Sequence, residues 1–362
     1  MSATHLMRNE LKRFLPWHQA RIDCLAQLML AMISVRTVNL TQLALAFEST
    51  VQSESVYQRV KRFFRHHVFE TEQVALLVTR WLDLGDRWLL CLDRTNWQLG
   101  QKPINLLILS VAYHGVAIPL MWTSLDKKGN SSTAERIALL ERFLKHFAVE
   151  QIDCLTADRE FRGYDWLAYL IKRGIRFRLR IPNNTQTHNR QRNARMPVTR
   201  LFAIQVGETM ILNRPRQLWG QALYLVATRS AAGEYVIVIT AHAPAQALAD
   251  YRRRWEIECL FSAMKRRGFN LEDTHMIEAE RLCRLIAVLT LAMCWCYKVG
   301  VWMDARQPIH RKSHQRRAQS VIRLGLDTLR RALLNTALEP ARLRALIRFL
   351  VAEPRKNSIA YG

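Results

Sequence analysis

Apolar residues recur at every third or fourth position through much of the N-terminal region, and this period predicts amphipathic helices. The clearest stretches cover residues 22–33, 40–47 and 56–64. Polar and charged residues fill the positions between them, as expected for helices that bury one face. We therefore predict a helical domain over residues 1–82.

The second and third of these helices resemble a helix-turn-helix. Asn39 or Thr41 can cap the first helix and Ser55 the second, because their side-chain oxygens accept bonds from free backbone N–H groups. The helix after Ser55 would carry a polar, basic face, where we expect contact with DNA. The expected contacts on that face are Gln58, Arg59 and Arg62. An ordinary helical hairpin is the alternative.

From residue 87 the pattern changes to short apolar runs that are separated by turns and helical stretches. Strands are predicted at residues 88–92, 105–114, 116–125, 152–157 and 175–181, and helices at 132–147 and 164–173. Ser132 and Glu135 stand three apart at the start of the first of these helices, as in a capping box. Strands that alternate with helices in this order indicate an α/β fold with a mixed sheet.

Residues 183–243 have a different character. A polar, basic stretch at 183–197 predicts a loop. Four short runs typical of strands follow, at residues 201–206, 209–213, 221–228 and 234–240. We interpret this block as a β-rich insertion with a sheet of its own, and not as a continuation of the α/β core.

A helix is predicted to begin at Pro244 and to carry the segment YRRRWEIECLFSAMK. One face would present Tyr251, Arg254, Glu258 and Lys265. On a continuous helix these four residues fall within roughly a 60° arc, with Trp255 beside them. A metal-binding acid flanked by cations and an aromatic ring is suited to phosphoryl transfer on DNA. A charged surface helix is the alternative.

Further helices are predicted at residues 276–299, 318–336 and 339–351, the last two in a basic tail. Five regions follow from the pattern as a whole. They are a helical DNA-binding domain (1–82), two parts of an α/β core (83–182 and 244–300), a β-rich insertion (183–243) and a basic helical C-terminal region (301–362).

The charge of the chain indicates its class of partner. Among its 362 residues, 54 Lys and Arg stand against 30 Asp and Glu, a formal net charge of +24. Such an excess favours a polyanion, either nucleic acid or an acidic membrane surface. An aromatic content of 9% argues against a disordered basic tail.

Cysteine usage and apolar runs indicate the compartment. The seven cysteines are odd in number and include no CxxC pair, which favours a reducing environment. No signal peptide is recognised, and the most apolar run, residues 285–297, is too short to span a bilayer. We expect a cytoplasmic, nucleoid-associated protein that binds DNA and not membranes.

Three acidic residues are candidates for catalysis. Asp93 and Asp158 each end an apolar strand, and Glu258 lies on the helix described above. A carboxylate at the end of a buried strand is costly unless it has a partner, although each Asp could simply cap a turn and pair with the following Arg. Three acids on separate elements of an α/β fold suggest a site for two Mg²⁺ or Mn²⁺ ions.

The motifs that contain these acids resemble those of DDE transposases of the insertion-sequence-four family. They are LDRTNW around Asp93, TADREFRG around Asp158 and YRRRWEIECLFSAMKRRGFNLEDT from Tyr251. The last resembles the family's YREK motif and its K-x2-G-F-x-L-E-x-T continuation. The resemblance covers roughly residues 30–275. It implies an RNase H-like catalytic core that is interrupted by a β-rich domain.

The resemblance also implies roles for individual residues. Asp93, Asp158 and Glu258 would be the metal-binding triad, and Tyr251, Arg254 and Lys265 would hold DNA phosphates near the cut. Trp255 would stack on a base flipped out of the helix, unless it packs in the core instead. Apart from the resemblance, the position of Arg159 and Arg162 just after the second acid makes them candidates for further DNA contacts, with surface charges as the alternative.

The implied activity is cut-and-paste transposition through a DNA hairpin, by a homodimer that pairs two ends of double-stranded DNA. Relatives use a second aromatic residue of the β-domain to displace the flipped base. Here the corresponding strand has only Tyr235, and Trp219 lies further upstream. The alternatives are a catalytically silent, domesticated DNA-binding regulator and a host RNase H-like nuclease.

Overall fold

The protein is described here by a computed structural model. It describes residues 2–67, 70–99, 101–189, 194–265, 267–313 and 317–352. The chain forms two compact units, which we call the sheet unit and the helical unit. The sheet unit contains Gly85–Asn96 and Asn105–Cys259, and the helical unit contains Met1–Leu84, Trp97–Ile104 and Leu260–Gly362.

The sheet unit is built on a mixed sheet, which confirms the predicted α/β class. Its first five strands are β1 (Trp88–Leu99), β2 (Lys102–Tyr113), β3 (Val116–Ser124), β4 (Ile152–Ala157) and β5 (Phe177–Ile181). In space they follow the order β3-β2-β1-β4-β5. β3 runs antiparallel to β2, whereas β4 runs parallel to both β1 and β5. The apolar runs form strands here because almost every residue of β4 and of the first half of β1 is buried.

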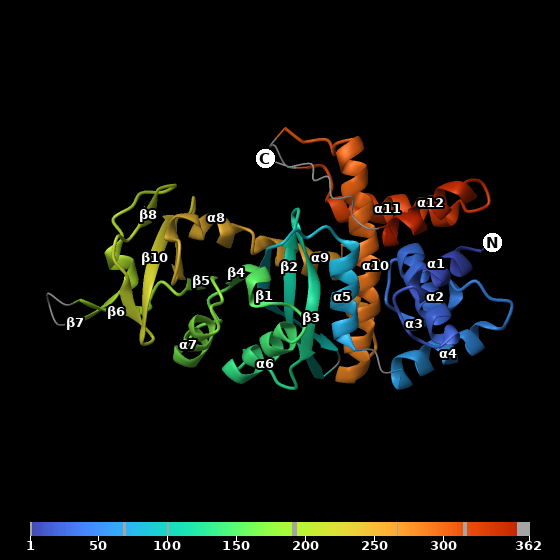
Figure 1. The fold of residues 1–362 in the computed structure, drawn as a ribbon, viewed down its shortest axis with the longest axis horizontal. Coiled ribbons are helices and arrows are strands. Elements are labelled where there is room, and N and C mark those ends of the chain that lie inside the picture. Colours follow the sequence, from blue (N-terminus) through green and yellow to red (C-terminus); the bar gives the residue numbers. More distant parts are fainter. Residues whose placement is uncertain are drawn as a thin grey trace. The chain divides into compact units, whose positions relative to one another are not determined.

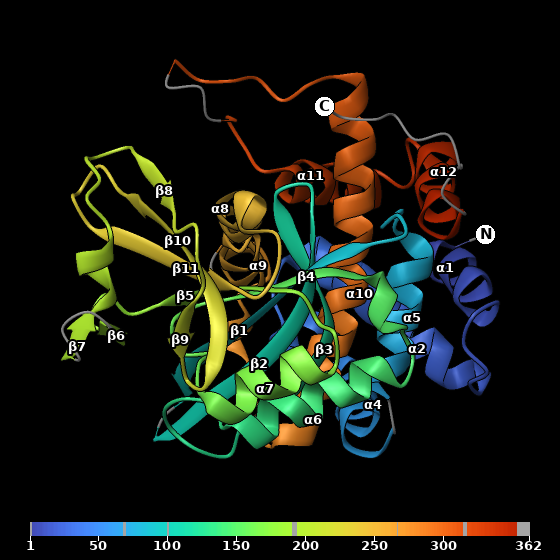
Figure 2. The ribbon, with the colours of Figure 1, turned by 60° about the vertical axis from the view of Figure 1, so that its left-hand side comes forward.

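The main strands of the β-rich block continue the sheet of the core, so the prediction that the block is not a continuation of this core is wrong. β11 (Tyr235–Thr240) pairs antiparallel with β5, and β10 (Gln221–Arg229) continues the same sheet to β8 (Thr209–Ile211) (Figure 2). β9 (Arg216–Leu218) pairs with β10. The last four residues of β11 are all buried, so this strand behaves as an interior strand. Without β11 the edge of β5 would expose unpaired backbone groups.

Two local predictions within this block also differ from the structure. β6 (Gln186–Asn189) and β7 (Ala194–Pro197) form a small antiparallel sheet where a loop was predicted. A short 3₁₀ helix, η2 (Val198–Leu201), and irregular chain replace the strand predicted at residues 201–206. The sequence carries no sign of these strands, because β6 (QTHN) is entirely polar and no residue of β7 (ARMP) is fully buried.

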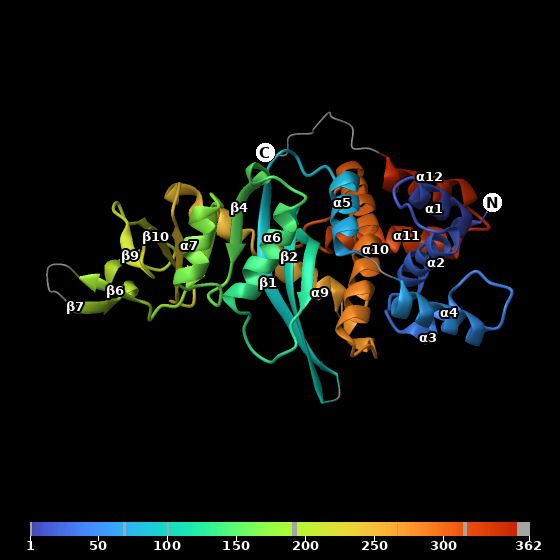
Figure 3. The same cartoon turned by 60° about the horizontal axis from the view of Figure 1, so that its bottom comes forward.

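Helices flank the sheet. α6 (Thr133–Leu144) packs against β3 and α7 (Tyr164–Lys172), and α8 (Ala247–Arg252) packs against β4, β5 and β11. Figure 1 shows α7 below and α8 above β5, and Figure 3 shows α6 and α7 in front of the strands. The predicted capping box of α6 is confirmed, with Ser132 Oγ accepting from Glu135 N and the Glu135 carboxylate accepting from Ser132 N. Short 3₁₀ helices η1 (Val149–Gln151) and η3 (Pro244–Gln246) precede β4 and α8.

A buried arginine fixes α8 to the sheet. Arg178 in β5 pairs with Asp250 in α8, with 3.0 Å between Nε and Oδ2. Its Nη1 also donates to Thr240 Oγ1 at 2.6 Å and to the carbonyl of His242 at 2.9 Å. These bonds tie the end of β11 and the start of the following helix to one strand of the core, and so set the position of Tyr251.

The helical unit begins with the predicted N-terminal helices. They are α1 (Ala3–Lys12), α2 (Gln19–Val35), α3 (Leu40–Leu45), α4 (Ser53–His66) and α5 (Thr71–Trp81). Asn39 caps α3 as predicted, because its side chain accepts from Thr41 N and Gln42 N. Ser55 does not cap α4. The helix begins two residues earlier, at Ser53, and Gln52 makes no side-chain cap bond.

The C-terminal part of the unit contains α10 (Ala279–Arg306), α11 (Val321–Leu334) and α12 (Pro340–Val351), with η4 (Leu271–Asp273) before them. α5 runs beside α10 (Figures 1 and 3), and α10 also contacts α2 and α11. The run at 285–297 lies within this helix of 28 residues, so the argument that it is too short to span a bilayer fails. Within the described chain α10 alone is long and apolar enough to do so. However, 83% of its apolar window is buried, which equally fits a core helix.

Two glycines allow α10 and α11 to approach at backbone distance. A Cβ atom at Gly325 would lie 1.6 Å from the carbonyl oxygen of Cys296, and one at Gly300 would lie 2.0 Å from that of Val321. Neither oxygen belongs to a side chain that could rotate away. The crossing of the two helices is therefore fixed by the absence of side chains at these positions.

We predict that Gly325→Ala destabilises the helical unit by about 3 kcal/mol, because a methyl group here must push the two helix backbones apart. Urea unfolding followed by circular dichroism measures the loss. Leu334→Ala, at a side chain of α11 that is 66% exposed, is the control and should unfold like the wild type. An unchanged midpoint for Gly325→Ala would show that the helices do not cross so closely.

Candidate active site

Asp93 and Asp158 lie at the same edge of the sheet. β1 and β4 are parallel neighbours, and the last residues paired between them are Leu92 and Ala157. Each acid is the next residue along its own strand direction. β1 continues to Leu99, so Asp93 lies within a strand and not at the end of one as predicted. Its place relative to β4 is nevertheless the one that brings the two acids together.

The carboxylate of Asp93 is largely buried, with 14% of its side chain exposed. It accepts from the backbone N–H of Arg94 at 2.8 Å and from Arg254 Nη1 at 3.1 Å. Burial raises the pKa of Asp93 to about 7, and the charges of Glu258 and Asp158 act in the same direction. The two hydrogen bonds lower this pKa but do not compensate for the loss of water.

The helix that carries the other predicted residues is not continuous, and the prediction of one helix from Pro244 is wrong. α8 ends at Arg252, and α9 (Trp255–Met264) begins after a tight connection. Through this connection the backbone bonds span three residues, as from Arg254 N to Tyr251 O at 3.0 Å. Residues three apart align in such a 3₁₀ turn, so Tyr251 and Arg254 still share a face.

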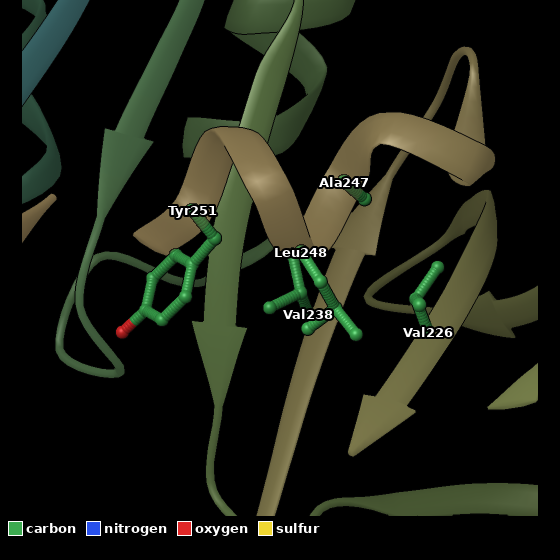
Figure 4. Close-up of a cluster of buried hydrophobic side chains, with 5 residues drawn as sticks. All are labelled: Val226, Val238, Ala247, Leu248 and Tyr251. Carbon is green, nitrogen blue, oxygen red and sulfur yellow. The ribbon is translucent and has the colours of Figure 1, made fainter. Parts of the chain in front are cut away.

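Tyr251 extends from α8 towards Asp158. Its ring is buried together with Leu248, Val238, Val226 and Ala247, and Figure 4 shows the hydroxyl at the end of the ring farthest from Val226. The hydroxyl donates to Asp158 Oδ1 at 3.3 Å. Burial raises the pKa of Tyr251, so the phenol remains a hydrogen-bond donor at neutral pH. The apolar cluster thus holds the ring of Tyr251 so that its hydroxyl points to Asp158.

Arg254 links the acids of the two elements. Its Nη1 lies 3.1 Å from Asp93 Oδ2 and 3.2 Å from Glu258 Oε1. Its guanidinium carbon is 5.7 Å from the ring centre of Tyr251. Burial would lower the pKa of Arg254, but the surrounding phenol and carboxylates raise it further than burial lowers it. A single guanidinium therefore pairs with two carboxylates and offsets only part of their negative charge.

This donor set matches the chemistry of a hard divalent cation, because its ligand atoms are carboxylate oxygens. Over the described ranges, however, no three His, Cys, Asp or Glu side chains stand close enough together to hold a metal as they are. Arg254 lies between two of the acids. A metal ion and this guanidinium would therefore compete for the same oxygens.

The structure places the remaining predicted residues in two groups. In the sheet unit Trp255 is 66% exposed, so the alternative of core packing is wrong. Arg159 and Arg162 are also exposed there, and Arg162 Nη1 donates to the carbonyl of Arg159. Lys265 instead lies in the helical unit, just past α9. Its Nζ is 3.1 Å from Glu272 Oε1 and 5.5 Å from the ring centre of Trp97.

A glycine shapes the chain after Lys265. A Cβ atom at Gly268 would lie 2.0 Å from the carbonyl oxygen of Ala263, which accepts from Phe269 N. Only glycine fits this turn without a shift of the backbone. The spacing K-x2-G-F noted in the sequence thus has a structural cause at the end of α9.

The expected DNA contacts of α4 lie in the helical unit and are unequal. Gln58 and Arg62 are exposed, and Gln58 donates to Glu54 at 2.7 Å. Arg59 is half-buried and interacts with the thiol of Cys24. The basic surface of the helix therefore consists mainly of Lys61, Arg62 and Arg65, which are all exposed.

The sequence did not reveal that two residues beside the acids, Arg94 and Glu160, pair with each other. Arg94 was considered as a partner of Asp93, but its guanidinium pairs with Glu160 at 2.7 Å. The alternative in which Asp93 forms an ion pair with the following Arg is therefore wrong, although the Asp93 carboxylate does accept from the backbone N–H of Arg94. A signal for this pair was present in the sequence. An Arg follows Asp93 directly and a Glu stands two residues after Asp158, so neighbouring strands would bring the two opposite charges together.

Comparison with known protein families matches residues 84–295 to the transposase DDE domain. The match covers more than half of the chain and includes Asp93, Asp158 and Glu258. A search of curated proteins finds no match.

We predict that Asp93→Asn stabilises the protein at pH 8, raising the thermal midpoint by at least about 2 °C. The raised pKa of Asp93 means that its ionised form is penalised in the folded state, fully above pH 7 and progressively less as the pH falls towards 4. The gain should therefore be smaller at pH 5. Thermal unfolding at both pH values measures it.

Asp250→Asn is the matched control for this prediction. Asp250 pairs with a buried arginine that has a purely structural position, so its loss should cost about 3 kcal/mol. If Asp93→Asn were as destabilising as Asp250→Asn, Asp93 would be a structural partner of Arg254 and not a strained functional acid.

Proposed function

Because the chain belongs to the transposase DDE domain family, we propose that it is a transposase of the insertion-sequence-four type. It would bind the terminal inverted repeats of its own element and catalyse cleavage, hairpin formation and strand transfer. The observation that carries the proposal is the cluster of Asp93, Glu258 and Asp158 around Arg254 and Tyr251. A mixed sheet with two acids at one edge also supports an RNase H-like core.

The three acids would hold the divalent metal that DDE transposases use, as two Mg²⁺ or Mn²⁺ ions. When bound, such ions activate a water or a 3′-hydroxyl and stabilise the leaving oxygen at phosphorus. Asp93 suits this role because it is largely buried, and Asp93 and Glu258 share a single guanidinium that a metal ion could replace. Their preference for oxygen-binding cations requires no histidine or thiol.

Arg254 and Tyr251 would hold the DNA strand. A guanidinium can bind a phosphate through two parallel hydrogen bonds, and a phenol of raised pKa can donate a third. Arg254 would then exchange its bonds to Asp93 and Glu258 for bonds to the backbone, which frees the carboxylates for metal. Lys265, Arg159 and Arg162 are further phosphate contacts under this proposal.

Trp255 would stack on the flipped base, since its indole is already presented to solvent. Two aromatic residues, Tyr235 and Trp219, are the candidates for displacing the base. Tyr235 is engaged, because its hydroxyl donates to Phe202 O at 3.1 Å and Arg229 lies over its ring. Trp219 has a backbone φ of 45°, a conformation uncommon outside glycine. We favour Trp219 for this role.

The proposal extends to assembly and location. Pairing two DNA ends requires two active sites, so we infer a homodimer in the DNA-bound synaptic complex. Helix α4 would contribute to binding of the repeats. A net charge of +24 fits a protein associated with the nucleoid in the cytoplasm.

We predict that Asp93→Asn, Asp158→Asn and Glu258→Gln each reduce DNA cleavage by more than about 100-fold, since even outer-shell changes around a metal cost 10- to 100-fold. The substrate is a plasmid that carries the DNA flanking the gene on both sides, with Mg²⁺ present. DNA affinity, measured by fluorescence anisotropy, should be unchanged or stronger.

Asp165→Asn, an exposed acid in the first turn of α7, is the control and should cut normally. Cleavage that persists in Asp93→Asn would exclude the proposed site. A wild-type protein that binds the flanking DNA without cutting would favour the silent regulator, and equal cutting of any duplex would favour a host nuclease.

We predict that the double variant Arg62→Ala, Arg65→Ala binds DNA more weakly and with less dependence on salt. Each lost phosphate contact should reduce the slope of log K against log salt by about 0.9. Titrations between low and moderate salt measure the slope. The double variant Arg62→Lys, Arg65→Lys keeps both charges and should retain the wild-type slope. No change on alanine substitution would remove α4 from the DNA surface.

A further inference from the structure

We propose that Arg94 and Glu160 form a positioning clamp that fixes Asp93 and Asp158 relative to each other. The inference rests on the proposed function, since it assumes that both acids hold metal. Neither clamp residue reaches the reacting atoms in this proposal. They act by setting where the two carboxylates stand.

The clamp is a two-pronged ion pair. Arg94 Nε donates to Glu160 Oε1 and Nη2 donates to Oε2, both at 2.7 Å. The side chains are 13% and 18% exposed. Two parallel bonds between planar groups fix orientation as well as distance. Each partner is close to one acid in sequence, because Arg94 follows Asp93 directly and Glu160 is two residues after Asp158.

The remaining donors of Arg94 anchor the clamp to its surroundings. Nη1 donates to Asn105 Oδ1 and Nη2 to Asn130 Oδ1, both at 3.0 Å. Asn105 is buried at the start of β2, and its Nδ2 donates to the carbonyls of Lys127 and Gly129 at 3.0 Å. The guanidinium is thus bonded through all three of its nitrogens, and it cannot rotate without breaking several bonds at once.

Backbone hydrogen bonds connect each clamp residue to the neighbouring acid. The N–H of Arg94 donates to Asp93 Oδ1 at 2.8 Å, so a fixed Arg94 also orients that carboxylate. On the other side, Phe161 N donates to the carbonyl of Asp158 at 3.0 Å and closes the turn that contains Glu160. Arg136 lies over the ring of Phe161 at 4.9 Å and supports the turn from below.

The sheet brings the two acids to one edge, but its backbone pairing does not reach the acids themselves. The pairing of β1 with β4 ends at Leu92 and Ala157, one residue before each acid. Beyond that point, the Arg94–Glu160 pair directly links the segments that contain the two acids. A buried ion pair is weak support for stability, because apolar residues of similar size often replace one without loss. Its specific contribution here is geometry at the place where two metal ligands must converge.

Lysine cannot replace arginine in this arrangement. It would keep the positive charge but lose the planar fork, so it could not bind both oxygens of Glu160 and both asparagines. Arg94→Lys therefore tests geometry with charge held constant. Glu160→Gln tests the same contact from the other side, and it carries the test if Arg94→Lys does not fold.

The experiment measures Mn²⁺ binding by electron paramagnetic resonance to the full-length protein in complex with the DNA that flanks its gene, with the same DNA alone as the background. Cleavage rate and thermal midpoint are measured alongside. Arg94→Lys and Glu160→Gln should weaken Mn²⁺ binding by about 10- to 100-fold, as outer-shell changes do. Raised Mn²⁺ should restore the cleavage rate, and DNA affinity should not change. Arg173→Lys is the matched control, because it alters the exposed Arg173–Glu141 pair of the same unit.

The outcomes separate the two proposals when Asp93→Asn is measured in parallel. If Asp93→Asn loses Mn²⁺ binding and the clamp variants keep it, the clamp inference is wrong and the proposed function stands. If Asp93→Asn binds Mn²⁺ like the wild type, the proposed metal site is wrong. A lower thermal midpoint with unchanged Mn²⁺ binding in Arg94→Lys would assign the pair a structural role only.

Discussion

The parallel pairing of β1 with β4 is the constraint on which the candidate site depends. Parallel neighbours leave the sheet at the same edge, so the residues after Leu92 and Ala157 emerge side by side. The elements around α8 bring further groups to that edge. Arg178 anchors α8 through Asp250, and the connection after α8 delivers Arg254 between Asp93 and Glu258.

Part of this arrangement was available from the sequence. The apolar run at the start of β1 is buried and that of β4 almost entirely so, which is why their pattern signalled strands and singled out Asp93 and Asp158 as the acids that follow them. The capping residues Asn39 and Ser132 were likewise recognised, because a cap bonds to backbone only two or three residues away. Features of this kind depend on residues close together in the sequence, so the sequence pattern is sufficient to predict them.

Other features depend on contacts between distant residues and could not be predicted. The partner of β11 is β5, more than fifty residues earlier, and no pattern within β11 names it. The break between α8 and α9 has a similar origin, since Arg253 at the break donates to the carbonyl of Ala112 in β2. A helical period in the sequence continues through this point, whereas the tertiary contacts favour a tighter turn. The pairing of Arg254 with both Asp93 and Glu258 follows from that turn, so it could not be predicted from the sequence either.

Arg254 gives the acid cluster a counter-ion that is part of the same chain. A group held by covalent bonds has an effective concentration that neither dilution nor chelation can lower. Arg254 therefore offsets part of the negative charge of Asp93 and Glu258 whether or not another cation is present. A positive charge built into the chain thus stands among these acids whatever the ionic composition of the solvent.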